Sequence, residues 1–155
     1  MNNTYYLRNA LTLNATGDKY NAIALLTNST EIKKHCHHFR EFNFSQSIKD
    51  GFVVFKICRG GDENILQGLV AVKPSTDFLE CANMEINDFN KSHISLYNGV
   101  GKCMIALCCK IAIDEGFEGY IAFFAKNQLR RYYERYGAKT LYGLRMFIDD
   151  ATQRN

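Results

Sequence analysis

The clearest hydrophobic pattern lies in the middle of the chain, where apolar segments of strand length alternate with polar turns. The segments GFVVFKICR at 51–59 and ILQGLVAVK at 65–73 are apolar and β-branched, and the GGDEN between them is typical of a turn. Together they predict an antiparallel hairpin. The segment DFLECANMEIN at 77–87 predicts a third strand.

A helical period replaces the strand pattern after the next loop. The apolar positions that share one face at this period are Val100, Met104, Leu107, Cys108, Ile111 and Ala112. We expect Gly116 to end this helix. Beyond it, GYIAFFAK at 119–126 predicts a strand, and QLRRYYERYGAK at 128–139 predicts a short amphipathic helix. The segment TLYGLRMFI at 140–148 predicts a last strand.

The first fifty residues give a weaker pattern. Asn28, Ser29 and Thr30 are candidate N-caps for the segment that follows, in which apolar and charged residues recur at helical spacing. We expect a helix from about Glu31 to Phe42. The predicted order is helix, hairpin, strand, helix, strand, helix, strand. It describes an α/β or α+β chain with a mixed sheet and right-handed strand-helix-strand crossovers.

Composition narrows the class of protein. A length of 155 residues predicts one domain over 1–155, and 46% hydrophobic with 23% charged residues is ordinary for a soluble globular protein. A formal charge of +3 permits an anionic ligand and argues against strong nucleic-acid binding. We see no basic-then-apolar leader and no apolar run of about 18 residues, so we expect neither a signal peptide nor a membrane span.

The cysteines and histidines do not form a metal motif. The spacings of the 6 cysteines match no zinc pattern, so we expect buried, reduced thiols, which suit the cytoplasm. In HCHH, His35 and His38 would share a helix face, but no acidic or cysteine partner is spaced to complete a site. We therefore predict no metal.

The motif with the strongest chemical implication is LYNGVG, which ends at Gly101 directly before the predicted helix. A helix N-terminus carries unpaired N–H groups and a partial positive charge, and glycines allow a phosphate to approach the backbone. The amides of Val100, Gly101, Lys102 and Cys103 would then face an anion. The alternative is a tight turn between loop and helix, and the pair Gly99 and Gly101 alone does not decide between the two.

Two familiar nucleotide-binding motifs do not match this stretch. A Rossmann fingerprint needs a third glycine where Met104 stands. A Walker P-loop needs a glycine where Leu96 stands and a serine or threonine where Cys103 stands. Both motifs therefore fail on residue identity.

The LYNGVG loop, the helix and strand after it, and the segment NQLRRYYERYGAK together resemble the GNAT superfamily of N-acetyltransferases. In that family a Gln/Arg-x-x-Gly-x-Gly/Ala loop opens a helix and binds the pyrophosphate of acetyl-CoA, and a later helix ends in a Tyr-x-x-x-Gly motif, here Tyr133 to Gly137. The resemblance covers roughly residues 50 to 150. Within the family, the sequence is similar to a bacterial subgroup of poorly known substrate. Leu96 replaces the Gln/Arg, and Ala138 replaces the usual aromatic.

The resemblance implies a GNAT acyl-CoA N-acyltransferase fold, with a mixed, mostly antiparallel sheet flanked by helices. It also implies acetyl-CoA as co-substrate, without a metal, and direct attack by an amine acceptor. The third strand would hold the pantetheine arm and thioester at Met84, Glu85 and Ile86. The pyrophosphate would contact Asn98, Gly99, Val100, Gly101, Lys102 and Cys103. The family's asparagine at the start of the last helix falls on Lys126, with Asn127 beside it, and these two residues would also contact the cofactor.

The same resemblance implies catalytic roles. Tyr133 matches the tyrosine that protonates the departing thiolate, although Tyr132 or Tyr136 could take this role, and Tyr133 could simply pack the helix. For the base we weigh Glu80, Glu85 and an ordered water chain. The two glutamates are an odd number of residues apart, so they point to opposite faces of a strand unless a bulge intervenes.

Three functions remain open at this point. The first is a cytoplasmic, bacterial N-acetyltransferase of unknown amine acceptor, whose acceptor side would include His35, His37 and Phe39. The second is a non-catalytic CoA-binding or protein-interaction module, which Leu96 and Ala138 favour. The third is a tRNA-directed GNAT toxin, which the basic residues interleaved with tyrosines after residue 125 favour. GNAT proteins often dimerise, so a homodimer is also an open expectation.

Overall fold

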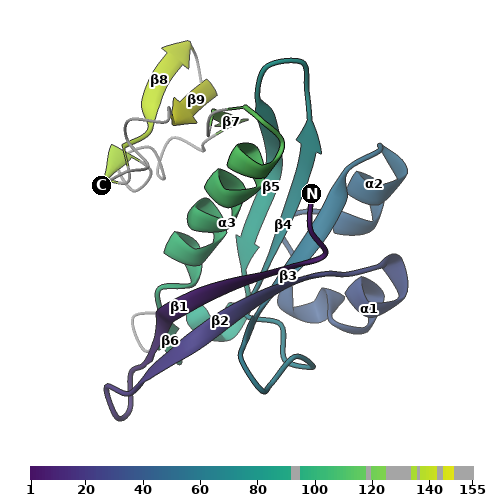
Figure 1. The fold of residues 1–155 in the computed structure, drawn as a ribbon. Helices are drawn as coiled ribbons and strands as arrows, with labels where there is room; N and C mark the ends of the chain where they lie inside the picture. Colours follow the sequence, from purple (N-terminus) through teal and green to yellow (C-terminus); the bar gives the residue numbers. More distant parts are fainter. Residues whose placement is uncertain (92–94, 118–119, 125–133, 136, 143–144, 149–155) are drawn as a thin grey trace.

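The computed structural model describes residues 1–91, 95–117, 120–124, 134–135, 137–142 and 145–148 (Figure 1). The helices are α1 (Ser29–Lys34), α2 (Phe44–Lys49) and α3 (Val100–Asp114), with 3-10 turns η1 (Cys36–His38) and η2 (Asp88–Asn90). The strands are β1 (Thr4–Leu13), β2 (Lys19–Leu26), β3 (Val53–Arg59), β4 (Gly68–Pro74), β5 (Leu79–Ile86), β6 (Tyr97–Asn98), β7 (Ile121–Phe124), β8 (Lys139–Tyr142) and β9 (Arg145–Ile148). No helix in these described ranges is long and apolar enough to cross a bilayer.

The strands of the described chain form one sheet in the order β6-β1-β2-β3-β4-β5-β7-β9-β8. Among the described strands, each pair of neighbours is antiparallel except β5 and β7, which are parallel. The predicted hairpin is β3 and β4, and the predicted third strand is β5. The mixed, mostly antiparallel sheet flanked by helices is therefore confirmed.

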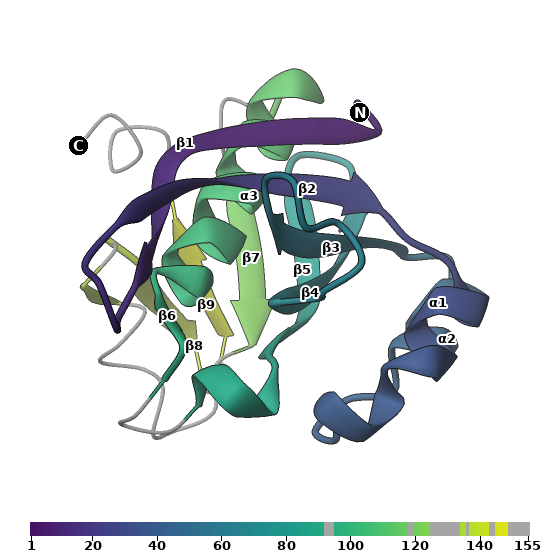
Figure 2. The ribbon, with the colours of Figure 1, turned by 90° about the horizontal axis from the view of Figure 1, so that it is seen from below.

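The N-terminal region differs from the prediction. β1 and β2 form a long antiparallel hairpin that we did not predict, and Figure 2 shows β1 at the border of the sheet. The predicted helix over 31–42 is wrong, because α1 ends at Lys34 and a turn and a loop precede α2. The predicted last strand is the antiparallel pair of β8 and β9. Most of the predicted helix at 128–139 lies outside the described residues.

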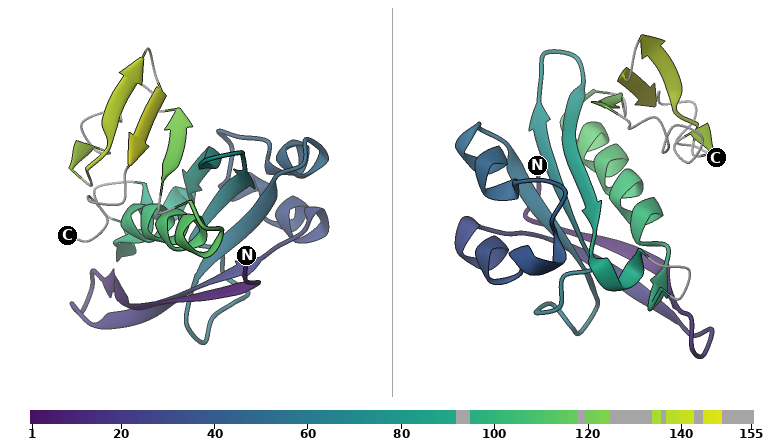
Figure 3. Two further views of the ribbon diagram at one scale, coloured as in Figure 1. Left: turned by 45° about the horizontal axis from the view of Figure 1, so that its top comes forward. Right: turned by 180° about the vertical axis from the view of Figure 1, so that it is seen from behind.

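Two hydrophobic clusters cover the two faces of the sheet. The larger lies under α3 and contains every apolar residue predicted for that helix face, all of them buried. The smaller lies under α1 and α2 and includes Phe44, Leu69 and Ala71. The left and right views of Figure 3 show α3 on one side of the central strands and the two short helices on the other. Gly68 allows α3 to pack closely, since a Cβ there would lie 3.1 Å from a methyl of Val100.

Gly99 is required by the chain itself. Its φ of 100° is in the left-handed region, and it occupies the N-cap position of α3. A Cβ at this position would overlap the carbonyl oxygen of Ala10 on β1. Both the backbone conformation and the close approach of β1 therefore exclude a side chain here.

We predict that Gly99→Ala lowers the free energy of unfolding by about 3 kcal/mol, because strain at positive φ is combined with a backbone overlap. Gly17→Ala is the matched control, since Gly17 has a φ of 77° but no atom lies within 4 Å of the position that its Cβ would take. The control should lose only about 1 kcal/mol from its backbone conformation. Urea unfolding of both variants measures the difference, and equal losses would contradict the proposed overlap with Ala10.

Candidate active site

β5 extends beyond the described part of its parallel neighbour β7. The two strands are paired at Leu79–Ile121, Glu80–Ala122 and Cys81–Phe123, and the described part of β7 ends at Phe124 whereas β5 continues to Ile86. On its other side β5 has a bulge, because Val72 pairs with Cys81 but Ala71 pairs with Asn83, which leaves Ala82 unopposed. A bulge bends a strand and increases its twist. The bend therefore lies next to the last described pair of β5 and β7.

The backbone of β5 beyond the bulge faces away from β4 at alternate residues. The Asn87 N–H donates to the Gln67 carbonyl at 3.0 Å, which marks these residues as a hydrogen-bonded pair. Antiparallel pairs alternate between bonded and non-bonded, so Glu85 bonds toward β4. Met84 and Ile86 then direct their N–H and C=O groups away from β4, on the side of β5 that lies beyond the described part of β7. Their side chains pack against the core under α3.

The bulge places Glu80 and Glu85 on the same face of the sheet. Glu85 lies opposite Leu69 and Glu80 lies opposite Lys73, and these two β4 residues are an even number of positions apart. Leu69 belongs to the cluster under α1 and α2. Both carboxylates therefore lie on the α1–α2 face. From the sequence alone, two glutamates five positions apart share a face only if the strand has a bulge, and the bulge at Ala82 is present.

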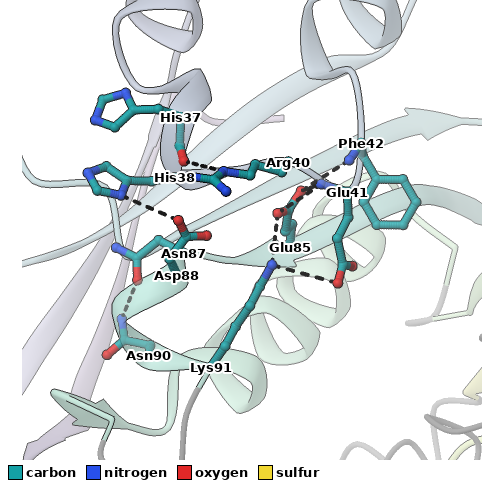
Figure 4. A network of polar contacts seen from close by, with 10 residues as sticks. All are labelled: His37, His38, Arg40, Glu41, Phe42, Glu85, Asn87, Asp88, Asn90 and Lys91. Atoms are coloured by element: carbon teal, nitrogen blue, oxygen red, sulfur yellow. Dashed lines mark hydrogen bonds and ion pairs between the residues drawn. The ribbon is translucent and has the colours of Figure 1, made fainter.

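The carboxylate of Glu85 is buried and fully engaged (Figure 4). Its oxygens accept hydrogen bonds from the backbone N–H of Glu41, at 3.1 and 3.2 Å, and from that of Phe42, at 3.2 Å. Lys91 Nζ donates to it at 3.0 Å and also lies 3.7 Å from the Glu41 carboxylate. These contacts compensate the buried charge. Glu85 thus ties the loop between η1 and α2 to β5.

Glu80 has a different environment. It is half-buried at the end of β5 where the pairing with β7 begins, and no hydrogen bond or ion pair to its carboxylate is recorded within the described residues. This position leaves its oxygens available to an incoming group. Between the two glutamates, Glu80 is the one whose surroundings suit proton transfer.

The first turn of α3 has backbone donors directed away from the helix. The first bond within the helix runs from the Cys103 N–H to the Gly99 carbonyl at 2.9 Å. The amides of Val100, Gly101 and Lys102 precede this bond, and Lys102 is exposed. The prediction that Cys103 offers its amide to an anion is wrong, because that amide is used inside the helix.

Cys103 instead has a structural role. It is buried, and its Sγ lies 3.8 Å from the Ala10 carbonyl oxygen. Burial raises the pKa of its thiol to about 12, and burial also raises the pKa of Cys81 well above its usual value. Both thiols are therefore neutral near pH 7, which does not suit a nucleophile. Cys36 is exposed, so the expectation of buried thiols fails at that position.

A buried amide network that we did not predict supports the loop before α3. The Tyr97 N–H donates to Asn90 Oδ1 at 2.8 Å, and Asn90 Nδ2 donates to Gln67 Oε1 at 2.7 Å and to Asn87 Oδ1 at 3.0 Å. All three amide side chains are buried. Asn98, by contrast, is exposed beside Asn14. The spacing of these amides along the chain follows no motif, so only the fold reveals the network.

The hydroxyl of the same tyrosine has its own support. Arg59 donates to the Tyr97 hydroxyl at 3.0 Å, and its guanidinium lies over the ring of Tyr20 at 3.6 Å. The bond to Tyr97 raises the pKa of Arg59, which stays fully charged. Asn90 thus holds the backbone of Tyr97, and Arg59 holds its side chain.

The acceptor side predicted at the first helix is only partly assembled. Phe39, Glu41 and Phe42 line a groove of about 600 Å³ between α1 and α2, whereas His35 lines a different hollow beside α1. His38 Nδ1 lies 3.8 Å from Asp88 Oδ2, and the rings of His37 and His38 are 4.0 Å apart (Figure 4). His35, His37 and Phe39 therefore do not share one pocket.

Other predicted residues lie outside the described part of the chain. These are Tyr133 with its alternatives Tyr132 and Tyr136, and the pair Lys126 and Asn127. In the described ranges, no group of three or more His, Cys, Asp or Glu side chains is placed to hold a metal ion.

Comparison with known proteins gives a fold but no sequence relative. No family model matches the chain, and no curated protein matches its sequence. Among solved structures it is similar to the crystal structure of AtaTR bound with acetyl-CoA, with 12% identity, a TM-score of 0.61 and coverage of 84% of this chain and 96% of that one.

Two further structures give the same result. One is a Tyr-to-Phe mutant of the AtaT toxin bound to the C-terminus of the antitoxin AtaR, with 10% identity, a TM-score of 0.63 and coverage of 86% of this chain and 96% of that one. The other contains the same mutant and AtaR segment together with acetyl-CoA, with 12% identity, a TM-score of 0.55 and coverage of 74% and 78%. The likeness in topology over most of the chain shows that this protein has the GNAT fold.

Proposed function

We propose that this protein is an acetyl-CoA-dependent N-acetyltransferase that transfers an acetyl group to an amine by direct attack. The observation that carries the proposal is the bulge in β5, beyond which the backbone of Met84 and Ile86 faces away from β4, together with the first-turn amides of α3. Structures of the same fold with acetyl-CoA bound support it. The described residues fit this co-substrate, because they offer free amides for a diphosphate and strand-like backbone for an extended amide chain.

Each part of acetyl-CoA has a matching group in the chain. The amides of Val100, Gly101 and Lys102 would hold the diphosphate, with added charge from the Lys102 side chain. The pantetheine arm contains amides, so it would pair with the outward backbone groups of Met84 and Ile86 as a short strand would. These groups would also orient the thioester carbonyl and stabilise its developing negative charge.

Attack on the thioester requires a neutral amine and a protonated leaving group. Glu80 lies on the α1–α2 face, where its carboxylate would take a proton from the incoming amine, directly or through water. Tyr133 would donate its phenolic proton to the thiolate as the C–S bond breaks. Glu85 would act as a positioning residue, because its carboxylate already binds the backbone of the loop that borders the acceptor groove.

The similarity to structures described as toxins supports a second candidate, a toxin that acetylates aminoacyl-tRNA. Its acceptor is also an amine, so the residues and steps would be the same. Expression in a bacterial host separates the candidates. Growth arrest that depends on Tyr133 favours the toxin, and normal growth favours a small-molecule or protein acceptor.

We predict that the first turn of α3 determines CoA affinity. Gly101→Glu should weaken CoA binding at least about 100-fold, because it places a carboxylate beside the diphosphate. Lys102→Ala should weaken it about tenfold through the loss of one charged contact. Titration calorimetry measures both, and Ile113→Glu is the matched control, since Ile113 is exposed near the other end of α3 and gains the same charge. Unchanged affinity in Lys102→Ala, with the control also unchanged, would place CoA elsewhere.

We predict that Glu80 and Tyr133 act in the chemical step. Glu80→Gln and Tyr133→Phe should each lower kcat about 100-fold or more while changing CoA affinity less than threefold, because neither is assigned to cofactor binding. Steady-state kinetics on an amine panel measures kcat, and Asp77→Asn is the control carboxylate, exposed just before β5. Full activity in Glu80→Gln would assign base catalysis to water. CoA binding without transfer to any amine would favour the non-catalytic module.

We predict that Glu85 is structural. Glu85→Gln should lower the free energy of unfolding by about 3 kcal/mol, because it removes the buried charge that Lys91 and the N–H groups of Glu41 and Phe42 bind. Lys91→Met alone should also destabilise, and the double variant should recover about 1 kcal/mol or more of the summed loss. Thermal or urea unfolding measures this coupling. Additive losses in the double variant would mean that the two residues do not act as a pair.

A further inference from the structure

The outer edge of β1 is open along most of its length. β6 pairs with β1 only at Thr12 and Leu13, and no other strand of the described chain pairs with that edge. Figure 2 shows β1 at the border of the sheet, close to α3. Edge strands are usually shortened, bulged or covered, because their free N–H and C=O groups invite pairing with another chain. A ten-residue edge strand therefore suggests a docking surface.

The hydrogen-bond pattern identifies the groups that are free. The Leu26 N–H donates to the Asn3 carbonyl at 3.1 Å, which marks these residues as a hydrogen-bonded pair. By alternation the backbone of Tyr5 bonds toward β2, and that of Tyr6 points outward. The side chain of Tyr6 is 72% exposed, the largest exposure among the large hydrophobic residues recorded as exposed. One backbone donor and one acceptor at Tyr6 are thus placed to receive an added strand.

β1 is bent directly beyond this open edge. Its register with β2 shifts between Leu7 and Leu11, and Asn9 has a φ of 50°. The Asn9 N–H donates to Asn21 Oδ1 at 2.9 Å, which holds the bend. A non-glycine residue at positive φ is uncommon, because the conformation is strained. It persists only where surrounding contacts hold the backbone in place.

A positively charged groove of about 520 Å³ lies between this bent strand and α3. Its lining includes the cations Arg8, Lys19, Lys102 and Lys110, all exposed, and none of the described residues that line it carries a carboxylate. Lys102 and Lys110 are two helical turns apart, about 12 Å along the axis. Two side chains four positions apart on a strand are separated by about 13 Å. The spacing of the lysines therefore suits carboxylates on a strand that lies beside α3.

We propose that the β1 edge and this groove bind an extended acidic segment of a partner protein. The segment adds a strand to the sheet at Tyr6 and directs its alternate Asp or Glu side chains toward Arg8, Lys19, Lys102 and Lys110. The proposal goes beyond acetyl transfer, because binding at the edge does not require CoA.

A peptide suits this surface better than a nucleic acid does. An RNA backbone offers acceptors to the cations but cannot match an alternating row of N–H and C=O groups. The open edge of β1 is therefore without a partner if the ligand is RNA. The formal charge of the whole chain is only +3, which is modest for a nucleic-acid surface.

The test uses a fluorescein-labelled nonapeptide, Glu-Val-Glu-Thr-Glu-Val-Glu-Thr-Glu, with blocked ends, and the full-length protein. Fluorescence anisotropy at low salt should give a Kd of the order of 50 µM or tighter, in the range of a single-strand contact with several ion pairs. The peptide with Gln in place of every Glu should bind at least about tenfold more weakly. The double variant Arg8→Glu, Lys110→Glu should reduce binding of the acidic peptide by a similar factor.

Strand addition has its own matched pair of variants. Tyr6→Pro removes the outward N–H without removing a bond to β2 and should weaken binding about tenfold. Tyr6→Ala removes the same side chain but keeps the N–H, so binding should change less than about threefold. If Tyr6→Pro fails to fold, an acidic peptide with N-methyl groups at alternate residues tests the same bonds on the wild-type protein and should bind about tenfold more weakly.

Three results would overturn the proposal. The first is no binding of the acidic peptide to the wild type below about 1 mM. The second is equal binding of the plain and N-methylated peptides, which would mean that the attraction of charges accounts for binding without strand addition. The third is binding of a nine-nucleotide oligouridine more tightly than the acidic peptide, which would assign the groove to nucleic acid. None of these measurements involves CoA, so they stand apart from the test of acetyl transfer.

Discussion

The bulge at Ala82 is the local distortion on which both faces of the candidate site depend. It bends β5 next to its last described pair with β7, just before Met84 and Ile86, whose outward backbone would hold the pantetheine arm. It also shifts the alternation of side chains, so that Glu80 and Glu85 face α1 and α2 together. Without it, one of these two carboxylates would point into the apolar cluster under α3, where an ionised group is strongly unfavourable.

A single turn, η2 with the residue after it, connects the two halves of the site. Asn90 binds the backbone of Tyr97 just before α3, and the adjacent Lys91 binds Glu85, which holds the loop at Glu41. Every one of these contacts is a buried or half-buried hydrogen bond, so breaking any of them would cost free energy that a bond to water does not restore. The loop before α3 and the loop at Glu41 are therefore held at one fixed separation, as the proposed transfer between two substrates would require.

Local patterns in the sequence were enough for the hairpin of β3 and β4, for β5 and for α3, because each of these elements is one continuous apolar segment, although the bulge within β5 left no local signal. They were insufficient for β1, since its bend at Asn9 interrupts the alternation that marks a strand. The helix predicted to Phe42 failed because Glu85 binds that residue's backbone N–H from across the fold. A local cap was present at Asn43, whose side chain accepts the Gln46 N–H. The amide network around Asn90 joins segments far apart in sequence and has no local signal.

The two glycines at the start of α3 are explained by different physical constraints. Gly99 is fixed by the protein itself, because β1 passes too close for a Cβ. The N-terminal hairpin also pairs Thr12 with Asn98, and its turn binds the Leu96 carbonyl through the Asn14 N–H at 3.0 Å. The hairpin therefore braces the loop that would hold the diphosphate. Leu96 stands where the family has a polar side chain, but its backbone anchors the loop, so rigidity of the loop can take the place of one ligand contact. Gly101 lies inside the first turn of α3, and its N–H precedes the first bond within the helix, so it is the glycine whose amide we propose to face a phosphate.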